Sequence, residues 1–132
     1  MTLNKSICLF YGFLMLLLAA CSGNEEDLNS TQKAEKISAS ALMKKFEKNP
    51  EDAEKKYLGK ALEVSGRITE VSNNSLGSII FVLKTESKAG AQVMCTMLSD
   101  NFKYEPGNDV KIKGFCHEYK FNVLMDKCVT VD

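Results

Sequence analysis

Five cysteines and one histidine are the residues of this chain best suited to nucleophilic chemistry or metal binding. Cys116 and His117 are adjacent, and adjacent side chains on a strand point to opposite faces, so these two cannot form a nucleophile and base pair. The cysteines lack the short C-x-x-C spacing of structural zinc sites. The chain also contains no Gly-rich phosphate loop, no HExxH motif and no Ser/His/Asp arrangement. We therefore expect no enzymatic activity, no catalytic residue, no bound metal and no cofactor.

Residues 1–20 have the composition of a secretory signal peptide. Lys5 supplies a positive charge, and residues 7–18 form an apolar run that is too short to span a bilayer as a mature helix. The motif Leu18-Ala19-Ala20-Cys21 resembles the bacterial lipobox, in which the cysteine is acylated after cleavage of the signal. This resemblance implies a lipid anchor on Cys21, because several acyl chains hold a protein stably at a membrane. An ordinary signal peptide with a coincidental cysteine is the alternative.

Residues 21–36 are predicted to form a flexible tether, because they show no apolar periodicity and cannot bury enough surface to order themselves. Within this segment the acidic run Glu25-Glu26-Asp27 closely follows Cys21. Such a run resembles the surface-export signals of Bacteroidota lipoproteins, although added solubility is an alternative explanation. We therefore expect an outer membrane lipoprotein, on the periplasmic side or at the cell surface.

The charge balance argues against a nucleic acid partner. The chain has 17 Lys and Arg and 17 Asp and Glu, and removal of residues 1–20 takes away only Lys5, which leaves a net charge of −1. Nucleic-acid-binding domains usually carry a basic excess. The lysines within residues 44–56 are interleaved with acidic residues, a pattern that is typical of a solvated surface.

Two short helices are expected ahead of the strands. Residues 38–49 place their apolar side chains on one helix face, with Ser38 or Ser40 available as the N-cap. The pair Asn49-Pro50 then ends this helix and begins a second one, and Gly59 is placed to end the second.

Five strands are expected after the helices. Alternation of Leu62, Val64 and Ile68 with polar residues predicts the first strand, and further strands are predicted at residues 79–84, 92–98, 110–117 and 123–131. Residues 99–104 could form a helical turn between the third and fourth strands. Five strands with a connector at this place are the arrangement of an OB-fold barrel. The expected fold is therefore mainly β (α+β), a five-stranded OB-fold barrel preceded by a short helical hairpin, within one domain of residues 37–132.

Gly66 and Gly114 follow similar patterns of alternating apolar residues. A glycine inside a strand marks a sharp bend, a bulge or a close approach of another backbone. We expect the two glycines to lie on partner strands of one strongly curved sheet.

Several motifs together resemble the tRNA_anti-like family over about residues 40–131. They are Tyr57-Leu58-Gly59-Lys60, Val64-Ser65-Gly66, Val93-Met94-Cys95, residues 106–116 and residues 123–128. The family consists of bacterial OB-fold proteins, many of them secreted or lipid-anchored. The resemblance implies this fold and brings no catalytic residue. Cys116-His117 departs from the family pattern, which commonly continues with a small residue and Gly.

Three cysteines remain once Cys8 has left with the signal and Cys21 is lipidated, in a compartment that permits disulfides. Cys116 and Cys128 flank the last predicted hairpin about equally, so we predict a disulfide between them and a buried free thiol at Cys95. A Cys95–Cys128 bridge is the alternative. The predicted bridge requires a bulge in the fifth strand to bring Cys128 onto the same face as the buried residues before it.

An OB barrel binds its ligands on the face of its second and third strands and in the adjoining loops. In this chain that rule selects Phe81, Lys84, Lys88, Gln92, Met94 and Thr96 as candidate ligand-binding residues. We expect a membrane-anchored lipoprotein whose OB-fold module binds a protein or an oligomeric ligand of the envelope. Oligonucleotide binding is one alternative, because it needs aromatic side chains beside basic ones, as Phe81 and Lys84 provide. An envelope structural or stress protein without a small ligand is the other.

Overall fold

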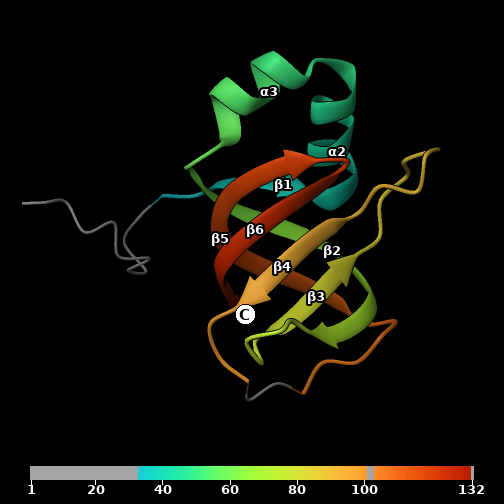
Figure 1. The fold of residues 1–132 in the computed structure, drawn as a ribbon, viewed down its shortest axis with the longest axis vertical. Coiled ribbons are helices and arrows are strands. Elements are labelled where there is room, and N and C mark those ends of the chain that lie inside the picture. Colours follow the sequence, from blue (N-terminus) through green and yellow to red (C-terminus); the bar gives the residue numbers. More distant parts are fainter. Residues whose placement is uncertain (1–32, 101–102, 132) are drawn as a thin grey trace, which may run out of the picture.

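The computed structural model describes residues 33–100 and 103–131, which form two helices and six strands (Figure 1). The predicted signal peptide, the lipidation residue Cys21 and most of the predicted tether lie outside the described residues. The first strand already includes Glu35 and Lys36, which were predicted to belong to the tether. No helix in the part of the chain that the structure describes is long and apolar enough to cross a membrane. The elements are β1 (Glu35–Ser38), α2 (Ala39–Lys48), α3 (Pro50–Tyr57), β2 (Ala61–Asn73), β3 (Ile79–Leu83), β4 (Val93–Met97), β5 (Asp109–Lys120) and β6 (Asn122–Thr130).

Local capping residues set the bounds of both helices. The Ser38 side chain accepts a hydrogen bond from the backbone N–H of Ala41 at 3.1 Å, so Ser38 is the N-cap of α2. Asn49 caps α3 in the same way by accepting from the N–H of Asp52 at 3.3 Å. Gly59 follows the end of α3 with a φ of 77°, a conformation that glycine adopts without strain. These contacts confirm the two predicted helices.

Strands β2 to β6 close into a barrel in the order β2-β3-β4-β6-β5, with β5 paired again to β2. The long strand β2 makes this closure possible because it has two antiparallel partners. Residues up to Arg67 pair with β5, whereas residues from Ile68 onward pair with β3. The change of partner occurs beside Gly66, as expected for a glycine at a bend. The five-stranded OB-fold barrel predicted from the sequence is confirmed, and β1 adds a short parallel strand along β2.

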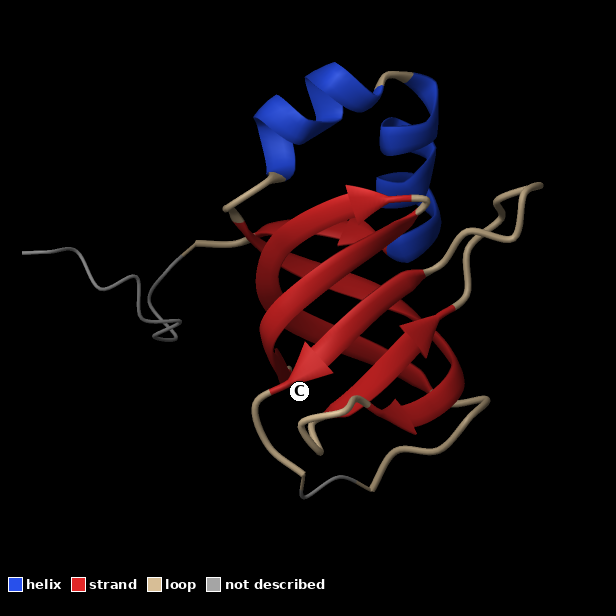
Figure 2. Cartoon of the chain, viewed as in Figure 1, coloured by secondary structure: helices blue, strands red, loops and turns tan. Residues whose placement is uncertain are grey.

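The two helices cover one end of the barrel (Figure 2). Phe46 of α2 is fully buried, and its ring centroid lies 5.9 Å from that of Tyr57 at the end of α3 and 4.8 Å from that of Tyr119 on β5. Aromatic pairs at these separations add to the stabilisation that burial alone provides. The helices are thereby joined to the same core that the strands enclose.

The connector between β4 and β5 runs at the other end of the barrel (Figure 1). Its described residues, up to Asp100 and from Lys103 onward, form no helix, so the helical turn predicted at residues 99–104 is not confirmed there. Tyr104 instead lies edge-on to Phe81, with 6.1 Å between the ring centroids. An aromatic side chain therefore contributes to covering this end of the barrel.

Candidate binding face of the barrel

Strands β3, β4 and β6 carry a continuous row of outward-facing side chains. Glu70 pairs with Val82, Val82 with Met94, Met94 with Leu124, and Leu124 with Glu118. Residues that are directly opposite on neighbouring strands share one face of a sheet. The row therefore runs from a carboxylate on β2, across three apolar side chains, to a carboxylate on β5.

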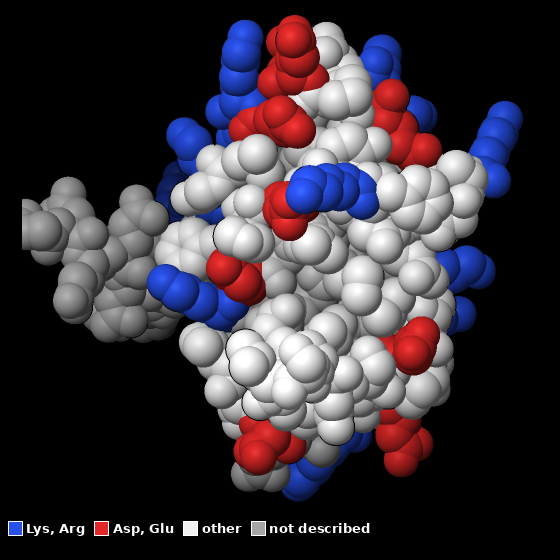
Figure 3. Space-filling model, in the orientation of Figure 1, with Lys and Arg blue, Asp and Glu red and all other residues white. Residues whose placement is uncertain are grey.

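The outer face consists of six residues, of which Val82 is only 3% exposed and the others are half-buried: Ile80, Val82, Gln92, Met94, Thr96 and Leu124. Ile80 pairs with Thr96 in a second row beside the first. Figure 3 shows that the charged side chains lie mostly around the margins of the exposed surface over β3 and β4. No residue of the outer face carries a charge. The outer face is thus a neutral and largely apolar surface with carboxylates at both ends of its central row.

Two exposed apolar side chains stand in the loops that border the outer face. Leu76 is 89% exposed in the turn between β2 and β3, and Phe121 is 56% exposed at the tip of the β5–β6 hairpin. In an OB fold these two loops flank the ligand face. Figure 1 shows the turn and the hairpin tip at opposite ends of the barrel. A partner lying along the outer face would therefore meet an apolar side chain at each end.

The structure places three of the predicted ligand residues, Gln92, Met94 and Thr96, half-buried on the outer face. Lys84 is exposed directly after β3. Phe81 differs from the prediction, because its side chain is fully buried in the core. The strand IIFVL is apolar on both faces, so its sequence did not indicate which residues point inward. Phe81 is a core residue and does not belong to the outer face.

Lys88 also lies away from the outer face. The loop between β3 and β4 rests on α2, where the Ser87 hydroxyl donates to a carboxylate oxygen of Glu47 at 3.1 Å. Lys88 lines an open pocket of about 470 Å³ at this contact, together with Lys44 and Lys48 of α2. Because Glu47 and Glu86 line the same pocket, its charges are mixed. The lysine predicted to help bind a ligand on β3 and β4 therefore faces a helix.

Five residues at the outer face and its borders were not selected from the sequence: Leu76, Ile80, Val82, Phe121 and Leu124. Leu124 did carry a signal, because it alternates with the buried residues Val123 and Met125 and so has the outward parity. Val82 carried none, since all residues of its strand are apolar. Leu76 and Phe121 could be recognised as neighbours of the outer face only after their loops had been assigned to their places in the barrel.

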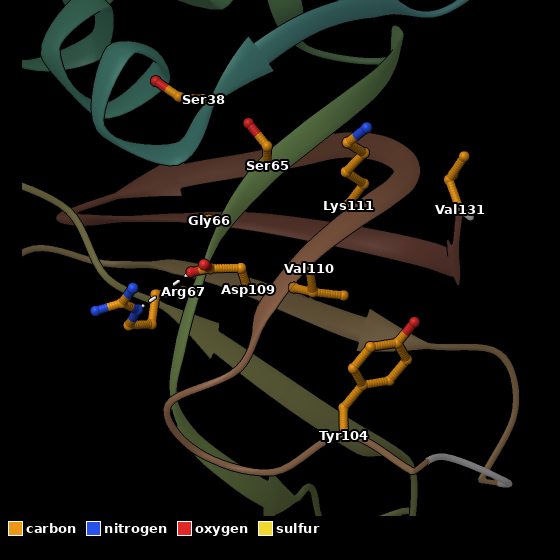
Figure 4. Close-up of a pocket in the computed structure, with 9 residues that line it drawn as sticks. All are labelled: Ser38, Ser65, Gly66, Arg67, Tyr104, Asp109, Val110, Lys111 and Val131. Atoms are coloured by element: carbon orange, nitrogen blue, oxygen red, sulfur yellow. Dashed lines mark hydrogen bonds and ion pairs between the residues drawn. The ribbon is translucent and has the colours of Figure 1, made fainter.

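A second open hollow, of about 520 Å³, lies on the side of the barrel formed by β1, β2 and β5 (Figure 4). Arg67 and Asp109 at its edge form an ion pair with 3.1 Å between Nε and Oδ1. Both side chains are largely exposed, so the pair contributes little stability. The pairing leaves this hollow without a concentrated charge, and Gly66, Val110 and Val131 give it small or apolar walls. We assign no specific chemistry to it.

The three described cysteines, Cys95, Cys116 and Cys128, are buried free thiols. A bulge does occur in β6, where Lys127 has a φ of 49° and the register to β5 shifts. Even so, Cys116 pairs with Met125 and not with Cys128, so the disulfide predicted between Cys116 and Cys128 is not formed in the structure and stays a prediction.

Burial, followed by the nearby charge of Asp126, raises the pKa of Cys116 to about 12. A hydrogen bond with the Cys95 thiol, together with burial, raises the pKa of Cys128. His117 lies on the surface, 3.6 Å from Asp126. Among the described residues, no group of three or more His, Cys, Asp or Glu could hold a metal ion.

A closed five-stranded barrel with this strand order defines an OB-fold domain. The tRNA_anti-like family model matches residues 1–129, and the chain belongs to that family. A solved structure from Klebsiella pneumoniae subsp. pneumoniae MGH 78578, provisionally described as a nucleic acid-binding lipoprotein, is similar to this chain. The TM-score is 0.60 at 22% sequence identity, over 73% of this chain and 92% of the other. Among curated proteins no significant match is found.

Proposed function

We propose that this protein is a membrane-anchored bacterial lipoprotein whose OB-fold barrel binds a protein partner through the outer face. The observation that carries the proposal is the row from Glu70 through Val82, Met94 and Leu124 to Glu118. Met94 and Leu124 at its centre are half-buried and offer apolar surface that a partner can remove from water, and such burial is the main favourable term in protein association. The exposed Glu70 carboxylate suits a partner segment that has a basic residue at that end, whereas Glu118 at the other end is already paired with Lys120.

The anchor rests on the motif Leu18-Ala19-Ala20-Cys21, which precedes the described residues. The similar Klebsiella protein is described as a lipoprotein, which supports the same type of attachment here. A tether that starts at Cys21 and ends before β1 would hold the barrel near the outer membrane, on the periplasmic side or at the cell surface. A partner of the barrel would then be a protein of the envelope.

Oligonucleotide binding is the second candidate function, because the Klebsiella protein is described as nucleic acid-binding and Phe121 is exposed beside Lys120. Bases stack on exposed aromatic rings, and lysines neutralise the phosphates. The charges of the outer face argue against this function. The Lys120 ammonium lies 3.0 Å from a carboxylate oxygen of Glu118, so these two charges compensate each other, and the exposed carboxylate of Glu70 at the other end of the central row repels a phosphate backbone.

The proposal is tested by a charge placed in the middle of the outer face. The full-length acylated protein is purified from detergent-solubilised envelopes, and the proteins that co-purify with it are quantified by mass spectrometry. Leu124→Lys should abolish co-purification of the partner. The matched control is Val131→Lys, which adds the same charge at another half-buried apolar residue, in the hollow on the β2 and β5 side. If Leu124→Lys retains every co-purifying protein, the proposal is contradicted.

A titration with a single-stranded oligonucleotide separates the two candidate functions. For a protein-binding face, both variants should bind a fluorescent dT 12-mer as weakly as the unmodified chain does. A DNA-binding face would instead bind more tightly in Leu124→Lys, because the added cation would contact phosphates, and that affinity would fall steeply with salt.

A further inference from the structure

Phe121 occupies a backbone conformation that aromatic residues rarely adopt. Its φ is 68°, in the left-handed region, and it lies at the reversal of a hairpin whose register places Lys120 opposite Asn122. A positive φ is several-fold enriched for Asn, Asp and His, and is without penalty only for Gly. A bulky residue in this conformation is an outlier. The reason for a phenylalanine here must therefore lie in its side chain and not in its backbone.

The Phe121 side chain gains little from burial in the domain, since 56% of it is exposed. Other aromatic side chains at the helix-covered end of the barrel do pack together: the Phe46 ring contacts both Tyr57 and Tyr119. Phe121 makes no ring contact of this kind among the described residues. Phe121 therefore combines a strained backbone with an aromatic surface left in water. Folding alone would favour Gly or Asn at this residue.

The hairpin tip is held firmly although its side chain is exposed. The side-chain oxygen of Asn122 accepts a hydrogen bond from the backbone N–H of Gln92 at 2.9 Å, and the side-chain nitrogen of Asn122 lies 3.6 Å from the sulfur of Met94. Gln92 and Met94 belong to the outer face, so these contacts tie the hairpin tip to the end of that surface. These contacts hold the residue next to Phe121 in place, and an interface segment that is ordered before binding costs less entropy on association than a mobile one.

We propose that Phe121 is the aromatic anchor of the outer face, which inserts against an apolar side chain of the protein partner. This inference rests on the proposed function and adds to it the residue that supplies most of the specificity at one end of the surface. Aromatic side chains dominate the energetics of protein interfaces, where a small number of residues carry most of the affinity. The partner is a peptide segment with an apolar stretch, which contacts Phe121 and the outer face, and a basic residue at the end that meets the exposed carboxylate of Glu70.

The test uses three substitutions at this residue in the full-length acylated protein. Phe121→Gly and Phe121→Asn both remove the ring and relieve the left-handed conformation, so both should raise the urea midpoint of unfolding. Phe121→Tyr keeps the ring and the strain, so its midpoint should stay close to that of the unmodified protein. The probe is a phage-displayed library of random 12-residue peptides, selected on the unmodified protein.

Selected peptides should share an apolar stretch with Lys or Arg at one end. Their affinity should fall about tenfold or more for Phe121→Gly and Phe121→Asn, as at other aromatic hot spots, and should be retained by Phe121→Tyr. A gain in stability together with a loss of binding identifies an anchor, whereas a merely structural residue would lose stability when replaced by Gly.

Two outcomes would overturn the inference. In the first, peptides lose affinity for Leu124→Lys but not for Phe121→Gly, so the outer face stands as a binding site without Phe121 as its anchor. In the second, no peptides are enriched, and the unmodified protein binds the dT 12-mer more tightly than Phe121→Gly does. That result would assign the Phe121 ring to base stacking and would also overturn the protein-binding proposal.

Discussion

Gly114 on β5 and Cys128 on β6 fit together only because one of them lacks a side chain. A β-carbon on Gly114 would lie 2.5 Å from the Cys128 sulfur and 3.0 Å from the backbone oxygen of Asp126. The bulge at Lys127 shifts the register so that three residues of β6 span two of β5, and this turns the Cys128 thiol into the core beside Gly114. The glycine is therefore required by a close approach of the neighbouring strand.

Gly114→Ala should destabilise the domain by about 1 to 3 kcal/mol, the usual range for an overpacked core site. Urea denaturation under reducing conditions measures the change in the free energy of unfolding. Adding Cys128→Ala to Gly114→Ala removes the sulfur atom and should recover part of the loss. Gly66→Ala is a milder comparison, because its nearest neighbour would be the Ala39 β-carbon at 3.2 Å. A stabilised Gly114→Ala variant would show that the strands separate more easily than the structure indicates.

Stability should fall in alkaline solution because of the Cys116 thiol. Burial raises its pKa in the folded protein from 9.0 to about 12. The folded state thus holds the proton more tightly than the unfolded chain does. The contribution of this thiol to the free energy of unfolding is complete below pH 9. It is lost as the pH rises from 9 towards 12, with a slope of about 1.4 kcal/mol per pH unit.

The measurement is the free energy of unfolding between pH 8 and 11 under reducing conditions, for the unmodified protein and for Cys116→Ala. Other groups titrate in this range, so the informative quantity is the difference between the two slopes. The slope should be shallower in Cys116→Ala. Parallel slopes would mean that the thiol is accessible to water in the folded protein.

The sequence predicted the features that depend on local signals. The bulge in the last strand was inferred only as a requirement of the Cys116–Cys128 bridge, which is not formed in the structure. The caps at Ser38 and Asn49, and a glycine in β2 next to its change of partner, could be read from residue types and spacing. These features depend on a few neighbouring residues, so tertiary context did not alter them.

The features that the sequence did not predict depend on contacts between distant segments. β1 has four residues and no alternation, and it exists because it pairs in parallel with β2. The inward position of Phe81 follows from the barrel and not from its uniformly apolar strand. Cys95 was named from the sequence only as the alternative partner of Cys128, and the structure places these two thiols within hydrogen-bonding distance without a disulfide. Their proximity depends on the parallel pairing of β4 with β6, which no local pattern indicates.

The Glu70 carboxylate at one end of the central row should steer the partner to the outer face. Glu70 is exposed, and Glu70→Lys should weaken binding of peptides with a basic end by about 0.2 to 1 kcal/mol, the range for an exposed charge pair. The loss should appear mainly in the association rate and should shrink at high salt. Surface plasmon resonance at 50 mM and 500 mM salt measures both effects. Tighter binding by Glu70→Lys would reverse the inferred charge of the partner.

Cys21→Ala should abolish acylation and membrane retention. Metabolic labelling with an alkyne fatty acid should mark the unmodified protein and leave the variant unmarked. A triple Ala replacement of Glu25-Glu26-Asp27 tests the direction of export separately, and should reduce the sensitivity of the protein to protease added to intact cells. An unchanged fatty acid label in Cys21→Ala would exclude this residue as the site of attachment.

Photo-crosslinking at Met94 in living cells tests the proposed binding face most directly. A photoreactive amino acid at this residue lies in the middle of the central row, and the same amino acid at the exposed Lys55 of α3 is the control. A discrete adduct should form from Met94, and protease but not nuclease should remove it. The adduct should be absent from the Lys55 control and should be lost when Leu124→Lys is added. An adduct that nuclease removes, or equal adducts from both residues, would contradict the proposed binding face.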